Sequence, residues 1–166
     1  MRFLLLLITA ILLSSCSAPP SILPELQYVA PTGQQGSLAT LVGSKEEMGP
    51  FIYDRTAYVY AVDEKQVMSV RGGWSKELPI QAGLRNVTVA FQNDRLDVRA
   101  DLPLQAVPGG KYQVRFRYFS DILFFLFGIG MPYCDLWIVD VETQKSVTEI
   151  RRGKFTPGGY DGPFGL

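Results

Sequence analysis

Hydrophobic and polar residues alternate with a period of two along much of the chain after its first 36 residues. In residues 86–92, NVTVAFQ, the large hydrophobic side chains are Val87, Val89 and Phe91, and residues 95–102, RLDVRADL, repeat the pattern. Alternation of this kind is typical of a strand that buries one of its two faces. We therefore predict that these two segments are neighbouring strands of a sheet.

Asn93 and Asp94 lie between the two segments, and both residue types tolerate the positive φ angles of a type I′ turn. A two-residue turn at this point predicts that Phe91 lies opposite Leu96. One face of the hairpin is then apolar throughout. A slip by one residue would bury charged side chains instead, so the hydrophobic pattern favours this register.

Further segments show the same alternation. They are residues 38–42, 56–62, 65–70, 111–118, 135–141 and 146–150. Asp63 and Glu64 lie at a turn between two of these segments, and residues 44–48, SKEEM, can form a single helical turn. About seven or eight strands separated by turn residues predict an all-β fold, an antiparallel β-sandwich.

One stretch breaks the alternation. Residues 120–133, SDILFFLFGIGMPY, cannot keep one polar face in water, and three interpretations remain open. The run is buried by the sandwich, or it is a loop inserted into a membrane, or it is a docking surface for a protein or an acyl ligand. The candidate hydrophobic contact patch consists of Ile122, Leu123, Phe124, Phe125, Leu126, Phe127, Ile129 and Met131.

The N-terminal residues have the pattern of a secretory signal. Arg2 supplies a positive charge, residues 3–13 carry none, and small residues follow. A membrane-spanning helix needs about 20 apolar residues, so this run is too short to span a bilayer.

Leu13, Ser14, Ser15 and Cys16 follow directly and resemble the lipobox of bacterial lipoproteins. The resemblance implies that the chain is cleaved before Cys16, that a diacylglycerol is attached to its thiol, and that the new amino group is acylated. Two or three acyl chains give stable membrane attachment without a spanning helix. In such lipoproteins an aspartate after the cysteine often signals retention at the inner membrane. Ser17 therefore favours the outer membrane, with the protein facing the periplasm.

We expect four regions along the chain. Residues 1–15 are the lipoprotein signal peptide, and residues 16–36, with four prolines, comprise the lipidated cysteine and a flexible tether. The folded β-sandwich domain is expected to start near Ser37 and to cover residues 37–152. Residues 153–166 form a tail rich in glycine and proline.

Two segments within the domain resemble PEGA-like and related β-sandwich modules of bacterial envelope lipoproteins. In residues 79–91, PIQAGLRNVTVAF, a corner with proline and glycine precedes a strand. In residues 106–118, AVPGGKYQVRFRY, a glycine turn precedes an aromatic-rich strand. The resemblance implies a sandwich fold and assigns no functional residue.

Composition limits the chemistry that the chain can perform. Lysine plus arginine equals aspartate plus glutamate, at 16 each, so we expect no general attraction to nucleic acid. The chain has no histidine, which excludes Ser-His-Asp and Cys-His catalysis and imidazole metal ligands. With Cys16 lipidated, Cys134 has no disulfide partner. We expect it to be a small buried hydrophobe, the alternative being a reactive or intermolecular thiol.

Asp135, Asp140 and Glu142 are close in sequence, and the last two are predicted to share a strand face, solvated and not catalytic. The expected function is therefore not enzymatic: a lipid-anchored interaction or accessory module of the envelope, with an envelope protein as partner and with no cofactor or metal. The alternative is a carrier or sensor that binds an acyl chain or a hydrophobic peptide through residues 122–131. An enzyme is the third choice.

Overall fold

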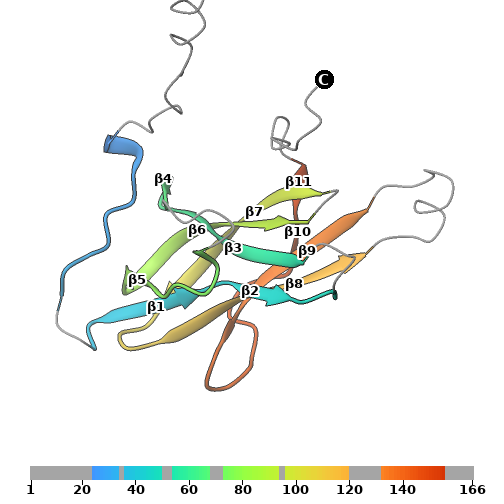
Figure 1. The fold of residues 1–166 in the computed structure, drawn as a ribbon. Helices are drawn as coiled ribbons and strands as arrows, with labels where there is room; N and C mark the ends of the chain where they lie inside the picture. Colours follow the sequence, from blue (N-terminus) through green and yellow to red (C-terminus); the bar gives the residue numbers. More distant parts are fainter. Residues whose placement is uncertain are drawn as a thin grey trace, which may run out of the picture.

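The computed structural model of the chain describes residues 24–33, 36–49, 54–67, 73–93, 96–119 and 132–155. These residues form two β-sheets packed face to face, preceded by one short 3-10 turn, η1 (Pro24–Leu26) (Figure 1). The predicted all-β sandwich is confirmed. The described residues contain eleven strands, more than the seven or eight expected, and three of these strands have only two residues.

The first sheet has the strand order β10-β9-β8-β1-β5, and the second has the order β11-β7-β6-β3-β2, with β4 paired to β3. The strands of the first sheet are β1 (Leu38–Val42), β5 (Leu78–Gln81), β8 (Lys111–Phe119), β9 (Tyr133–Asp140) and β10 (Arg151–Arg152). Those of the second sheet are β2 (Ser44–Glu46), β3 (Arg55–Val62), β4 (Lys65–Gln66), β6 (Gly83–Gln92), β7 (Asp97–Ala106) and β11 (Lys154–Phe155).

One strand pair of the antiparallel sandwich is parallel. β1 lies between β5 and β8, and it is antiparallel to β5 but parallel to β8. Because β5 and β8 run in opposite directions, a strand between them must be parallel to one of the two.

Alternate residues of both sheets fill the space between them, as the period of two predicts. Phe91 of β6 is fully buried, and its ring lies 4.9 Å from that of Phe116 and 5.6 Å from that of Tyr118, measured between centroids. Since β6 and β8 belong to different sheets, these three rings join the two layers across the core. Aromatic pairs at such distances contribute about 0.5 to 1.5 kcal/mol beyond their area burial.

The β6–β7 hairpin forms with a register that differs from the predicted one. Phe91 pairs with Val98 instead of Leu96. The backbone N–H of Asn93 donates to the Leu96 carbonyl (3.0 Å), and the Leu96 N–H donates to Asn93 Oδ1 (2.7 Å). Asn93 is therefore bonded to Leu96, whereas the predicted turn places Gln92 opposite Arg95. This change moves the pairing by two residues, so the same side chains still face the core.

The predicted turn at Asp63 and Glu64 is confirmed. Both residues have positive φ angles, of 49° and 66°, and Val62 pairs with Lys65 across them. This is the geometry of a type I′ hairpin. The following strand, β4, has two residues, whereas the prediction extended the strand to residue 70, and residues 68–70 lie outside the described ranges.

Two other predicted elements are wrong. The helical turn at residues 44–48 is absent because β2 pairs with β3 there, and Lys45 Nζ contacts Asp54 Oδ2 at 2.7 Å. The strand at residues 146–150 is reduced to a single bridge between Ser146 and Val139. Next to that bridge, the Thr148 hydroxyl accepts the Ile138 N–H (3.0 Å), so a side chain replaces the backbone as the hydrogen-bond partner.

The last described strands close one side of the sandwich. β10 pairs with β9 of the first sheet, and β11 pairs with β7 of the second, with Gly153 between them. Arg151 Nη1 donates to the carbonyl of Asp101 (3.0 Å), which adds a second link between the sheets. Strand pairing therefore continues to Phe155, beyond the predicted domain end at residue 152.

Residues 24–33, which we call the N-terminal segment, close the other side. Gln27 forms a bridge with Gln66 of β4, in the second sheet. The Tyr28 hydroxyl donates to the Pro79 carbonyl of β5, in the first sheet, at 2.9 Å. The folded part consequently begins earlier than the predicted Ser37, and it includes part of the predicted tether.

Candidate functional site

A surface pocket of about 240 Å³ lies where the N-terminal segment crosses from one sheet to the other. Its lining residues come from this segment, from the β3–β4 turn and from the β5–β6 corner. They are Tyr28, Val29, Pro31, Val62, Asp63, Lys65, Gln81 and Arg85.

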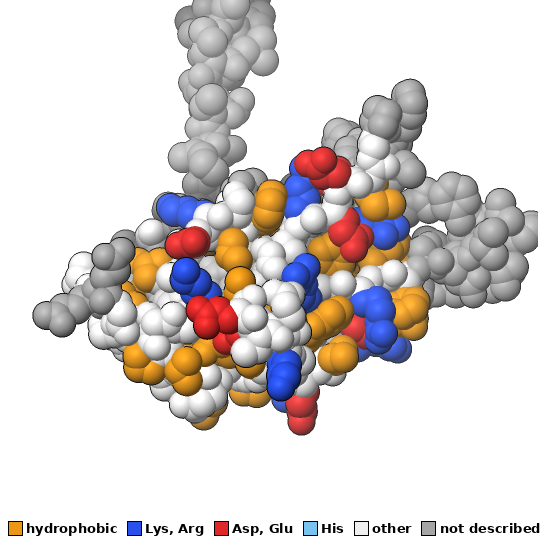
Figure 2. Space-filling view, turned by 90° about the horizontal axis from the view of Figure 1, so that it is seen from below, with side chains coloured by type: hydrophobic (Ala, Val, Ile, Leu, Met, Phe, Trp, Pro, Cys, Tyr) orange, Lys and Arg blue, Asp and Glu red, His pale blue; other side chains and the backbone are white. Residues whose placement is uncertain are grey.

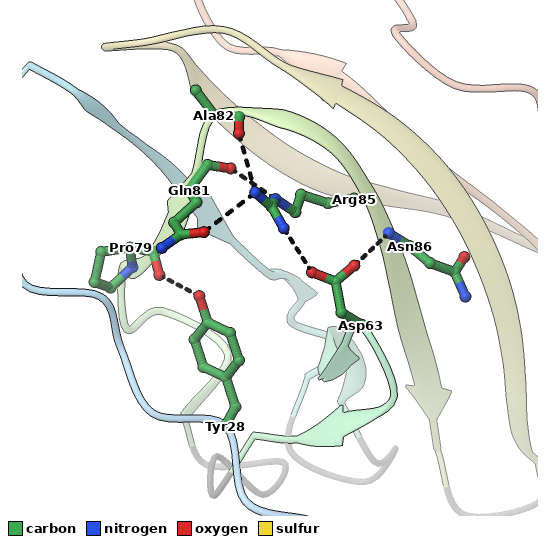
Figure 3. A network of polar contacts seen from close by, with 7 residues as sticks. All are labelled: Tyr28, Asp63, Pro79, Gln81, Ala82, Arg85 and Asn86. Carbon is green, nitrogen blue, oxygen red and sulfur yellow. Dashed lines mark hydrogen bonds and ion pairs between the residues drawn. The ribbon is translucent and has the colours of Figure 1, made fainter.

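The guanidinium of Arg85 occupies the centre of the polar network at this pocket (Figure 3). Its Nε donates to the Gln81 carbonyl (3.1 Å), and its Nη2 donates to Gln81 Oε1 (3.2 Å) and to the Ala82 carbonyl (3.1 Å). Its Nη1 contacts Asp63 Oδ2 at 3.0 Å, while Asp63 Oδ1 accepts the Asn86 N–H at the same distance. All three nitrogens of Arg85 therefore bind the fold. The network stabilises the corner and the positive-φ turn.

Tyr28 packs against the core from the edge of this pocket. Burial raises the pKa of its hydroxyl, and the nearby Arg85 opposes this effect. The phenol therefore stays neutral and donates its hydrogen bond to Pro79. The pocket is best explained as the place where the N-terminal segment is held on the domain.

Of the three carboxylates that are close in sequence, Asp140 stabilises the turn after β9. Asp140 Oδ1 accepts bonds from the backbone N–H (2.7 Å) and the hydroxyl (3.0 Å) of Thr143, and these bonds lower the pKa of Asp140. Glu142 lies in the turn after β9, so the prediction that it shares a strand face with Asp140 is wrong. Within the described ranges, no group of Asp, Glu and Cys side chains is arranged to hold a metal ion.

Cys134 is fully buried on the inner face of β9, and burial raises the pKa of its thiol. A thiol that is shielded from solvent and stays protonated is inert. The interpretation of Cys134 as a small buried hydrophobe is confirmed.

The outer face of the first sheet carries a group of arginine and aromatic side chains, which we call the arginine–aromatic surface. It consists of Arg115, Arg117, Phe119, Tyr133, Asp135, Trp137 and Arg152, from β8, β9 and β10. On the face seen from below, Figure 2 shows basic side chains (blue) among hydrophobic ones (orange).

Strand pairing determines which of these side chains meet. Phe119 pairs with Tyr133, and their rings stack at 4.8 Å. Arg117 lies over the Phe119 ring at 5.1 Å, and Arg152 lies over the Tyr133 ring at 3.7 Å. Two guanidinium groups thus flank a pair of stacked rings, an arrangement stabilised by cation–π attraction.

Asp135 lies between the same two arginines. Its Oδ2 contacts Arg117 Nη2, and its Oδ1 contacts Arg152 Nε, both at 3.3 Å. The Asp135 side chain is almost buried, whereas those of Arg117 and Arg152 are 58% and 62% exposed. The carboxylate therefore orients the two guanidinium groups while most of their surface stays in contact with solvent.

None of the predicted site residues belongs to this surface. Cys16 and the whole patch from Ile122 to Met131 fall outside the described residues. The arginine–aromatic surface was not predicted as a site. In the sequence, Arg115 and Arg117 alternate with hydrophobic residues within 111–118. This alternation identifies a polar face of the strand, but it does not identify the residues that lie opposite on the neighbouring strand.

Comparison of the chain with models of known protein families, with curated proteins and with solved structures gave no match. The η1 turn is too short to cross a membrane, and no other helix occurs in the part of the chain that the structure describes.

Proposed function

We propose that the protein is a non-catalytic interaction module of the bacterial cell envelope, held by a lipid on Cys16 at the periplasmic face of the outer membrane. The arginine–aromatic surface carries this proposal, because a rigid sheet presents exposed arginine and aromatic side chains there. Arginine, tyrosine and tryptophan contribute much of the binding energy at protein interfaces. The lipobox-like residues 13–16 support the lipid anchor.

The roles of the polar side chains favour a module over an enzyme. Asp63 and Asp140 hold turns, and Asp135 is paired with two arginines. A catalytic carboxylate needs access to a substrate and a pKa suited to proton transfer. Each of these carboxylates instead binds neighbouring groups of the fold.

A carrier or sensor that uses residues 122–131 is the second candidate. Residues 120–132 connect Phe119 to Tyr133 in the sequence, and the rings of these two residues stack on the arginine–aromatic surface. Replacing Phe124 and Phe127 with serine tests this candidate. We expect a stable protein that no longer co-purifies with lipid or hydrophobic peptide, whereas a protein that fails to fold would favour a buried role for the run.

Lipid anchoring is tested by mass spectrometry of the mature protein. We expect the chain to start at Cys16 and to carry a diacylglycerol and an acylated amino group. The Cys16→Ala variant should keep its signal peptide. An unmodified first residue, a different first residue, or a processed Cys16→Ala chain that still fractionates with membranes would contradict the proposed anchor.

A further inference from the structure

We propose that the arginine–aromatic surface binds an acidic protein partner, with Arg117 and Arg152 contacting carboxylates and with the neighbouring rings supplying apolar contact area. The inference rests on the proposed function and adds to it the binding surface and the chemistry of the partner.

The two guanidinium groups are ordered before any partner binds. Each lies over an aromatic ring and donates to one oxygen of Asp135. A guanidinium has five N–H groups, so most donors of Arg117 and Arg152 remain available, and both side chains are more than half exposed. A partner therefore finds oriented donors, and binding costs less side-chain entropy than it would with unrestrained arginines.

The charge of the surface selects the kind of partner. The surface contains three arginines and one acidic residue, Asp135, so its net charge is about +2. The hydrogen-bond partner of Arg115 is the neutral Gln144 side chain (3.3 Å). Arginine forks match carboxylates in geometry as well as in charge. Phe119, which is exposed, and the half-buried Tyr133 and Trp137 add the apolar contact that a protein surface offers.

The position of the surface favours a protein over the anchoring membrane. The N-terminal segment, which leads to Cys16, is bound at β4 of the second sheet and at β5, an edge strand of the first sheet (Figure 1). The arginine–aromatic surface lies on β8, β9 and β10, toward the opposite edge of the first sheet. It is therefore remote from the segment by which the domain is attached.

The test measures binding of a fluorescent octapeptide of alternating glutamate and leucine to the mature lipoprotein in neutral detergent. We expect saturable binding that weakens as salt is added. The triple variant Arg117→Gln, Arg152→Gln and Asp135→Asn should bind the peptide more weakly, by about tenfold or more. Asp135→Asn is included so that no unpaired carboxylate is left at the buried residue 135. The control is Lys65→Gln, which makes the same change in net charge at the β3–β4 turn and should leave binding within about twofold.

Circular dichroism and thermal unfolding check that the variants fold. If the triple variant does not fold, the pair Arg117→Lys and Arg152→Lys replaces it, because lysine keeps the charge but not the planar fork, and we expect a loss of several-fold. Equal binding of the triple variant, equal binding of an octapeptide of lysine and leucine, or binding only to vesicles containing phosphatidylglycerol would overturn the proposal. Lipidation of the same sample is measured by mass spectrometry, so a failure of the anchor and a failure of the surface are distinguished.

Discussion

Gly153 lies so close to Val98 that a Cβ atom at residue 153 would be 2.5 Å from Val98 Cγ2. The contact occurs where the chain passes from β10 in the first sheet to β11 in the second. Because Val98 is buried in the core, it cannot move away without disturbing the packing around it. A glycine at residue 153 therefore permits this closure of the sandwich.

The first prediction follows from this contact. Gly153→Ala should lower the free energy of unfolding by about 2 kcal/mol, as overpacking in a core does. Urea unfolding monitored by circular dichroism measures the change. In a protein that already carries Val98→Ala, Gly153→Ala should lower the free energy of unfolding by less, because the smaller side chain makes room for the new methyl group. An unchanged free energy of unfolding in Gly153→Ala would show that residue 153 and β7 move apart without destabilising the fold.

The second prediction concerns the hydrogen bond from Tyr28 to Pro79. Tyr28→Phe removes the donor and leaves a half-buried carbonyl without this partner, which should cost about 1 kcal/mol. Hydrogen exchange should become faster in residues 24–33 and remain unchanged in β6. Val29→Ala, at an exposed position of the same segment, is the control. Equal exchange rates in the Tyr28→Phe variant and the original protein would contradict the proposed role of Tyr28.

The third prediction is a pH dependence at Asp97. Burial raises the pKa of Asp97 above its ordinary value of 3.8, and Arg99 opposes this effect. The folded state therefore binds the proton more tightly than the unfolded state, so ionisation of Asp97 destabilises the fold as the pH rises above 3.8. Asp97→Asn removes this ionisation. We expect it to stabilise the protein at pH 7 by roughly 0.5 to 1 kcal/mol.

The gain from Asp97→Asn should decrease on acidification and disappear below the ordinary pKa of aspartate, because the original side chain is then protonated in both states. Thermal unfolding across a pH series measures this. Glu142→Gln, at the exposed turn after β9, is the control. A stabilisation by Asp97→Asn that is the same at acid and neutral pH would show that charge is not its cause.

The fourth prediction concerns Cys134. Iodoacetamide at mildly alkaline pH should leave Cys134 unmodified in the folded protein, because the thiol is buried and its pKa is raised. Modification should follow addition of denaturant, and mass spectrometry detects it. Fast alkylation without denaturant would mean that the β9 region opens in the native state.

The alternation of hydrophobic residues was sufficient to predict much of the fold. The strand at residues 38–42 was predicted with its observed bounds, and the Asp63–Glu64 turn follows from two charged residues between alternating segments. The β6–β7 register was wrong by two residues, because the Asn93 side chain bonds to Leu96 and moves the turn. The hydrophobic pattern cannot detect a shift of two, which leaves every side chain on the same face.

Two features could not be predicted from periodicity. β10 and β11 have two residues each, and two residues do not define a period. The arginine–aromatic surface depends on which residue of β9 lies opposite Arg117. Residues 120–132 separate β8 from β9, and a connection of that length does not fix the register as a short turn does. The pairing of Arg117 with Asp135 was therefore visible only in the structure.

The position at which the N-terminal segment joins the sandwich would determine how far a lipid-anchored domain can travel from the membrane. If Cys16 carries the lipid, the seven residues 17–23 are the only chain between the bilayer and η1, instead of the twenty residues 17–36 expected from the sequence. At about 3.5 Å per residue, the greatest reach falls from about 70 Å to about 25 Å. A tether this short keeps the attached end of the domain within about 25 Å of the lipid surface. Release of Tyr28 and Gln27 from the sandwich would nearly triple that distance.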